Sequence, residues 1–123
     1  MIKISSLKKL VTDSMAIDLG TASTIIAVRE RGIVVDEPTL VAINELTEEV
    51  VAFGQEASDM SGREGRDIVV TAPMIGGVVG DFERTKKLLA YFVKKAKTGG
   101  SNISLQAVMS MVSDVTHVEQ RAL

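Results

Sequence analysis

The 123-residue sequence has no cysteine, a single histidine and no long apolar run, and each absence excludes a class of chemistry or structure. Without cysteine, the chain can form no disulfide, no thiolate metal site and no cysteine nucleophile, which is compatible with a reducing compartment. One histidine, His117, cannot build a histidine-rich metal centre. Because no run of about 18 apolar residues occurs, no segment is expected to cross a bilayer as a helix.

An excess of charge of one sign is also lacking. Fourteen basic and sixteen acidic residues give a formal net charge of -2, so the composition predicts no surface for nucleic acid. The glycines at positions 76, 77 and 80 do not have the G-x-G-x-x-G spacing, and no G-x-x-x-x-G-K-[ST] string occurs, which leaves dinucleotide and P-loop sites unsupported. What is present is an apolar content of 46%, enough for the core of one domain.

The first twelve residues, MIKISSLKKLVT, predict a short, basic, amphipathic helix. Its apolar residues share one helical face, its lysines lie elsewhere, and no acidic residue interrupts it. Such a helix suits an anionic membrane interface, where apolar burial and lysine attraction add. The residues expected to make this contact are Ile4, Leu7, Lys8, Lys9, Leu10 and Val11. The alternative is a frayed terminus or a helix packed on its own domain.

From residue 14 onward the pattern predicts an α/β domain whose mixed sheet begins as an antiparallel meander. Three β-branched runs, separated by short turns that contain glycine at 20–24 and 31–32, span residues 14–19, 24–30 and 33–43. Pro38 marks an edge, a bulge or a break between two strands. Further strands are expected at 50–54, 67–71 and 105–112, and a short helix at 55–61. Asp81 is expected to cap a helix that runs to about Lys97 and covers the sheet, and the glycines before it indicate a bent connection.

The end of the sequence carries a signal for one more helix. Thr116 and Glu119 have the T-x-x-E spacing of a capping box, but Leu123 leaves room for only about two turns. We therefore expect the chain to stop inside an element. A sheet without its later strands would expose an edge and an apolar face, so we expect self-association.

The stretch MAIDLGTAST, residues 15–24, has the composition of an anion-binding corner. Gly20 lets the backbone approach a ligand, the amides of Thr21, Ala22 and Ser23 can point at phosphate oxygens, and the hydroxyls of Thr21, Ser23 and Thr24 add donors. Asp18 would repel a phosphate, so its useful role would be to hold a hydrated divalent cation. The alternative is a plain hairpin with a turn glycine and an aspartate at the strand end.

In its context this corner resembles the first phosphate loop of the actin-like ATPase superfamily. Six blocks, in this order, resemble the MreB family of bacterial actins from about Met15 onward: IDLGTAST, GIVVDEPTLVAI, FGQEASDMSGR, APMIGGVVGDF, YFVKKAK and VTHVEQRAL. Ser23 departs from the family pattern, because an asparagine is common there, but the exchange keeps a polar side chain.

The resemblance implies the N-terminal part of an actin-like, ribonuclease H-like ATPase fold. A membrane-anchor helix would occupy residues 1–12 and the domain residues 14–123, with a small inserted subdomain at about 41–82. The implied function is that of a cytoskeletal filament protein that binds ATP and governs cell shape, located in the cytoplasm and peripheral at the inner membrane face. Gly20, Thr21, Ala22, Ser23 and Thr24 would bind phosphates, and Asp18 would hold Mg²⁺ through water.

The same resemblance limits the expected activity. In the family, the glutamate that positions the attacking water, the second phosphate loop and the adenosine pocket lie beyond the position where this sequence ends. We therefore expect no catalytic residue here, weak or absent binding of Mg-ATP by the chain alone, and no turnover. The expected partners are a second copy or a full-length actin-like homologue and the inner membrane surface. The alternative function is a nucleotide-independent module that binds or caps a filament or membrane.

Overall fold

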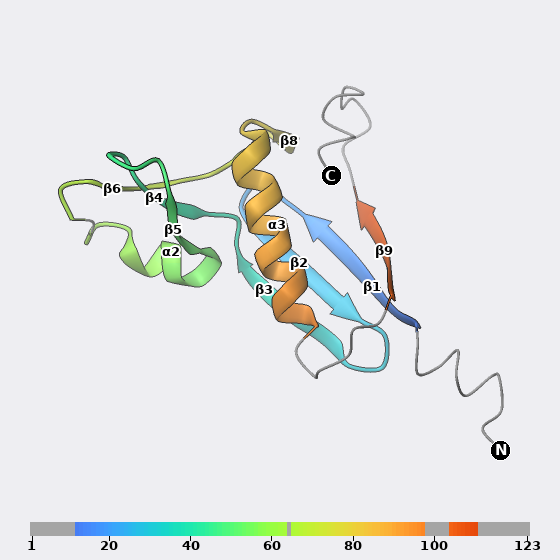
Figure 1. Ribbon diagram of the computed structural model, residues 1–123. Coiled ribbons are helices and arrows are strands. Elements are labelled where there is room, and N and C mark those ends of the chain that lie inside the picture. The colour runs from blue at the N-terminus through green and yellow to red at the C-terminus, as the bar shows by residue number, and fades with distance from the viewer. Residues whose placement is uncertain (1–11, 64, 98–103, 111–123) are drawn as a thin grey trace, which may run out of the picture.

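The computed structural model describes residues 12–63, 65–97 and 104–110 and shows two main layers of strands with a helix against each (Figure 1). A four-stranded mixed sheet forms the larger layer, and a three-stranded sheet lies beside it. The helix expected over 1–12 lies outside the described residues, except that Thr12 already belongs to the first strand. The capping box at Thr116 and Glu119 also lies outside them.

The larger sheet has the strand order β3 (Gly32–Pro38), β2 (Ser23–Val28), β1 (Thr12–Leu19) and β9 (Ser104–Ser110). The pairs β1–β2 and β2–β3 are antiparallel, whereas β9 lies parallel to β1. The antiparallel meander and the mixed sheet are thus confirmed. In β1, Met15, Ile17 and Leu19 point to the core while Ala16 and Asp18 are exposed, as the two-residue period of a half-buried strand requires.

One long helix, α3 (Phe82–Ala96), covers the apolar face of this sheet (Figure 1). The carboxylate of Asp81 caps it by accepting the Arg84 N–H at 3.0 Å, as expected. Its buried stripe recurs at helical spacing and consists of Thr85, Leu88, Phe92 and Ala96. The apolar residues of this stripe pack against a set from the strands: Met15, Ile17, Ile26, Val28, Val35, Val41 and Ile43.

The smaller sheet has the order β5 (Val50–Phe53), β4 (Val41–Asn44) and β6 (Ile68–Thr71), all antiparallel. The helix α2 (Gly54–Met60) packs on one of its faces over small buried alanines. Pro38 marks a break, because β3 ends there and the chain enters the second sheet three residues later. This layer lies within the range 41–82 expected for a small subdomain, and the division into subdomains stays a prediction.

A buried carboxylate links the two layers. The side chain of Glu37, at the end of β3, accepts the Gln55 N–H at 3.0 Å at the start of α2 and accepts a hydrogen bond from the Lys95 ammonium on α3. Gly54 lies against this carboxylate with a φ of 59°, and a Cβ there would lie 2.6 Å from Glu37 Oε1. A charge this deep in the protein is tolerated because it is paired and hydrogen-bonded.

Two of the three glycines expected to form a bent connection, at positions 76 and 77, form the turn of a short hairpin between β7 (Met74–Ile75) and β8 (Val78–Val79), and Gly80 follows β8. Gly76 and Gly77 both have left-handed φ values, 57° and 80°. A two-residue connection with positive φ at both positions matches the twist of a hairpin, and glycine adopts it without strain. Each strand has only two residues, so the alternation in the sequence was too short to predict them.

Candidate functional site

The corner between β1 and β2 is tighter than the sequence predicted. Only residues 20–22 connect the strands, and Ser23 and Thr24 already belong to β2. The Gly20 N–H donates to the Ser23 carbonyl at 3.0 Å and closes the turn. A Cβ on Gly20 would lie 2.7 Å from that same carbonyl oxygen, so glycine is needed here because a side chain has no room.

Two contacts from distant parts of the chain hold the tip of the corner. The Thr39 N–H, between β3 and β4, donates to the Ala22 carbonyl at 3.0 Å. The Gly77 N–H, at the tip of the β7–β8 hairpin, donates to the Thr21 hydroxyl at 2.6 Å. Because both partners belong to turns next to hydrogen-bonded strands, these contacts hold the corner in position. Pre-organisation of this kind lowers the entropic cost of binding.

Thr24 does not face solvent with the rest of the corner. Its side chain is fully buried, and its hydroxyl shares a 2.8 Å hydrogen bond with the equally buried Thr39 hydroxyl. The interpretation of Thr24 as a phosphate contact is therefore wrong in this geometry. Since Thr24 is in register with Leu19, its side chain lies on the core side of the hairpin and stabilises the corner from behind.

The groups that do face solvent are those of Asp18, Thr21, Ala22 and Ser23, all of which are exposed. Within the described part of the chain, the amides of Thr21 and Ala22 meet no protein acceptor. The Thr21 hydroxyl accepts from Gly77 and can still donate its own hydrogen. The corner therefore presents several donors in one place, and donors grouped at a turn suit an anion.

Asp18 supplies the negative charge beside these donors. It lies on the exposed face of β1, in register with Ile25 of β2. Asp18 also takes part in an interaction within the chain, so a hydrated cation would not be its only partner. Among the residues that the structure describes, no three acidic or histidine side chains gather closely enough to hold a metal ion. A single carboxylate of this kind fits a cation that keeps most of its water.

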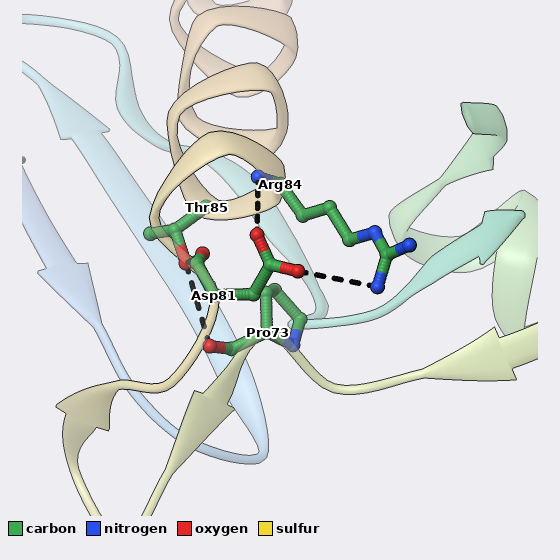
Figure 2. A network of polar contacts seen from close by, with 4 residues as sticks. All are labelled: Pro73, Asp81, Arg84 and Thr85. Carbon is green, nitrogen blue, oxygen red and sulfur yellow. Dashed lines mark hydrogen bonds and ion pairs between the residues drawn. The ribbon is translucent and has the colours of Figure 1, made fainter. Parts of the chain in front are cut away.

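A second polar network fixes the hairpin that supports Thr21 (Figure 2). The Pro73 carbonyl accepts hydrogen bonds from the N–H groups of Gly80 and Asp81, at 2.9 and 3.0 Å, and from the Thr85 hydroxyl at 3.4 Å. The Asp81 carboxylate pairs with Arg84 at 3.2 Å. Figure 2 shows Pro73, Asp81, Arg84 and Thr85 converging at the first turn of α3. The start of α3 is thereby joined to the base of the hairpin.

Sequence reasoning missed this support because its partners are far apart in the chain. The hydrogen bond from Gly77 to Thr21 joins residues that are 56 positions apart. The one available signal was the Gly-Gly pair between apolar β-branched residues, which is typical of a two-residue hairpin.

The residues expected to contact a membrane are not brought to this site. Ile4, Leu7, Lys8, Lys9, Leu10 and Val11 all lie outside the described residues. Over 12–63, 65–97 and 104–110, no helix has the length and apolar character needed to cross a membrane.

Comparison with known proteins gives consistent matches. Residues 12–123 match the family model for MreB/Mbl proteins. The chain is 38% identical over 122 residues to the cell shape-determining protein MreB of Haemophilus influenzae, covering 95% of this chain and 35% of that protein. It is 39% identical over 109 residues to the cell shape-determining protein Mbl of Bacillus cereus, a match that covers 89% of this chain and 33% of that protein.

Solved structures agree with the sequence matches. The crystal structure of MreB5 of Spiroplasma citri bound to ADP superimposes with a TM-score of 0.76 at 32% identity, over 90% of this chain and 33% of that one. A MamK double helical filament matches with a TM-score of 0.71 at 22% identity, over 90% of this chain and 36% of that one. At this level of identity the match shows only that the fold is shared. The chain thus has part of the actin-like α/β fold and spans about a third of the length of these relatives. This chain belongs to the MreB/Mbl family of bacterial actin-like proteins.

Proposed function

We propose that this chain carries the first phosphate-binding corner of a cytoskeletal protein that binds Mg-ATP, assembles with copies of itself and determines cell shape at the inner face of the membrane. The observation that carries the proposal is the corner at residues 18–23, where exposed amides and hydroxyls are held in place beside one carboxylate. Family membership supports it, as do relatives described as cell shape-determining proteins and an MreB5 described as bound to AMPPNP.

Each group of the corner has a definite role in this proposal. The amides of Thr21 and Ala22 and the hydroxyls of Thr21 and Ser23 donate to phosphate oxygens. Asp18 repels phosphate and therefore holds the cation through water. When bound, Mg²⁺ neutralises part of the phosphate charge. The Gly77 N–H donates to the Thr21 hydroxyl and holds its oxygen in place, so this hydroxyl keeps its own hydrogen for a phosphate oxygen.

The corner alone should bind weakly. Association costs roughly 4–15 kcal/mol in lost translational and rotational freedom before any affinity appears. A few hydrogen bonds and one carboxylate offset only part of this cost. Hydrolysis further requires a positioned water and stabilised charge on both sides of the transferred phosphoryl group, which the corner does not supply. We expect millimolar affinity at best and no turnover by this polypeptide alone.

Isothermal titration with Mg-ATP tests the proposal. We expect a small heat for the chain and its loss in Asp18→Ala. The matched control is Asp36→Ala, because Asp36 is an exposed aspartate in the same cross-strand row, with Ile25 between the two. Equal heats for the native chain and Asp18→Ala, or no heat at millimolar ligand, would refute the proposal that this corner takes part in Mg-ATP binding by this chain.

A nucleotide-independent binding or capping module is the second candidate function. It is favoured by the burial of Thr24, which removes one hydroxyl from those available to a phosphate, and by the interaction that Asp18 already makes, with which a hydrated cation would compete. Co-sedimentation with anionic vesicles, with and without residues 1–11, tests its membrane part. Loss of pelleting on deletion supports the anchor at the inner membrane surface, and unchanged pelleting removes it.

A further inference from the structure

We propose that Thr39 is a positioning residue for the phosphate-binding corner, because its hydroxyl, paired with that of Thr24, sets the distance at which the corner is held. Thr39 lies 15 positions from Thr24 and outside the corner, in the connection between β3 and β4. Residues 37–40, which contain Thr39, are named here the brace. This role rests on the proposed function, since the position of the corner matters only if the corner binds phosphate.

Two neighbouring hydrogen bonds join the brace to the corner. The Thr24 and Thr39 hydroxyl oxygens lie 2.8 Å apart, and the Thr39 N–H donates to the Ala22 carbonyl at 3.0 Å. Both threonine side chains are fully buried. Because the same residue of the brace makes both bonds, a change in the length of the first changes the geometry of the second.

A pair of hydroxyls lets the two backbones approach more closely than a pair of methyl groups does. Oxygen atoms that share a hydrogen lie about 2.7–2.8 Å apart, whereas carbon atoms in contact lie about 3.5–4.0 Å apart. Valine has the shape of threonine with a methyl group in place of the hydroxyl, so two valines would need about 1 Å more space. The brace and the corner would then separate, and the 3.0 Å bond from Thr39 to Ala22 would lengthen or break.

The far side of the brace is fixed, so the corner is the part that moves. Before Thr39, the Glu37 carboxylate accepts the Gln55 N–H at 3.0 Å and a hydrogen bond from an ammonium group of α3. After Thr39, the Leu40 carbonyl accepts the Gly54 N–H at 2.9 Å. These bonds join the brace to the start of α2 and to α3. A longer contact at Thr39 therefore displaces the three-residue turn of the corner.

A displacement of this size matters for phosphate binding. The Ala22 carbonyl belongs to the turn that carries the exposed amides of Thr21 and Ala22, so these amides move with it. Hydrogen bonds from N–H groups to oxygen span about 2.7–3.2 Å between donor and acceptor. A shift of about 1 Å therefore takes an amide out of reach of a phosphate oxygen that other groups hold in place.

Amide hydrogen exchange followed by NMR tests this spacing without nucleotide. When Thr24→Val is combined with Thr39→Val, neither hydroxyl is left unpaired, so the midpoint of thermal unfolding should stay within about 4 °C of the native value. The amide at position 39 should nevertheless exchange at least tenfold faster, because its bond to the Ala22 carbonyl is lengthened. The internal reference is the Arg29 N–H, which donates to the Ser14 carbonyl at 2.9 Å at the other end of the same hairpin and should exchange at the native rate.

Serine provides the matched control, since Thr39→Ser keeps the hydroxyl and removes only a methyl group. Its amide at position 39 should exchange within threefold of the native rate. Thr71→Val removes a threonine hydroxyl from β6 of the other sheet and should also leave this rate unchanged. Thr39→Val alone deprives the Thr24 hydroxyl of its partner, so this variant should unfold at least about 4 °C below the native chain.

Isothermal titration with Mg-ATP measures the consequence for binding. The doubly substituted chain should give at least fivefold less heat than the native chain at the same millimolar concentration, whereas Thr39→Ser should give the native heat. A loss of heat without a loss of thermal stability distinguishes positioning from a purely structural role, in which the two change together.

Two results would overturn the role of Thr39: exchange at position 39 within threefold of the native rate in the doubly substituted chain, or exchange at least tenfold faster in Thr39→Ser. If the doubly substituted chain does not fold, Thr39→Ala takes its place, because it removes the hydroxyl and adds no bulk. Its amide at position 39 should then exchange at least tenfold faster than that of Thr39→Ser, and equal rates would overturn the role.

The exchange measurement needs no nucleotide, so its failure is separable from that of the proposed function. A heat of Mg-ATP binding that depends on Asp18, together with unchanged exchange at position 39, would refute the role of Thr39 alone. Fast exchange in the doubly substituted chain, together with no Mg-ATP heat in the native chain, would refute phosphate binding by the corner and leave Thr39 as a residue that only sets its shape.

Discussion

Replacing Gly20 with alanine tests the geometry on which the candidate corner depends. The new Cβ would lie 2.7 Å from the Ser23 carbonyl oxygen, and both groups belong to the backbone, so neither can rotate away. To restore an ordinary contact, the two sides of the turn must separate by roughly 0.5 Å or more. That movement lengthens the 3.0 Å hydrogen bond between the Gly20 N–H and the same oxygen.

The magnitude follows from three contributions. Forced close contacts in a packed site typically cost about 1–3 kcal/mol. Weakening the hydrogen bond costs up to about 1 kcal/mol more. Alanine also lowers the conformational entropy of the unfolded chain, which offsets about 0.4–1 kcal/mol of this loss in the free energy of unfolding. We therefore expect Gly20→Ala to lower the free energy of unfolding by about 1–3 kcal/mol and to weaken any Mg-ATP binding, because the tip at Thr21 and Ala22 moves with the turn.

Urea unfolding followed by circular dichroism measures this change. The matched control is Gly65→Ala, because no atom lies within 4 Å of the position that a Cβ would take at Gly65 and its φ is not left-handed. We expect that control to be neutral or slightly stabilising. If Gly20→Ala unfolds within about 0.5 kcal/mol of the native chain, the turn does not have the described geometry and the reasoning about the corner is refuted.

Three further predictions concern the junction of the two layers. Gly54→Ala should lower the free energy of unfolding by about 3 kcal/mol, because this position combines a left-handed φ with close contacts to Glu37 and Phe92. Gly62→Ala is the control, since its φ is 78° but its surroundings are open, and it should lower the free energy of unfolding by only about 1 kcal/mol. Equal losses of the two variants in urea unfolding would contradict this prediction. Phe92→Ala should lower the free energy of unfolding by about 3–5 kcal/mol, because the ring is fully buried. A loss below about 1 kcal/mol in urea unfolding would mean that this ring does not pack in the core. Hydrogen bonding to Glu37 raises the pKa of Lys95 above its ordinary value near 10.5. The contribution of this ion pair to the free energy of unfolding is therefore complete below pH 10.5 and is lost as the pH rises through the folded-state pKa of Lys95. Lys95→Met should therefore lower the free energy of unfolding by about 1 kcal/mol at neutral pH and by progressively less above pH 10.5. Thermal unfolding of both chains over a range of pH measures this difference. A difference between the two chains that grows with pH would refute the pairing of Lys95 with Glu37.

Much of the architecture could be predicted from the sequence because its signals are local. The Asp81 cap and the apolar stripe of α3 depend on residues three or four positions apart. The meander of β1, β2 and β3 follows from two-residue alternation interrupted by turn glycines. The composition of the corner likewise indicated which residues to examine, although the Thr24 side chain is buried and the Gly20 N–H is used within the turn.

The sequence could not predict which side of the corner each hydroxyl faces. A shift of one residue in the length of a turn moves a side chain to the opposite face of the strand, and this decides the burial of Thr24. Nor could the two-residue strands β7 and β8 be predicted, because their pattern is too short to have a period.

By itself, then, the sequence determined the helices α2 and α3, the main strands, the family and the chemical character of the corner, because those depend on neighbouring residues or on ordered blocks. Only the tertiary structure decided that Gly77 supports Thr21 and that Lys95 meets Glu37, across separations of 56 and 58 residues. The physical reason is that these contacts form only after the core beneath α3 has packed and brought distant turns and helices together, so no local pattern encodes them.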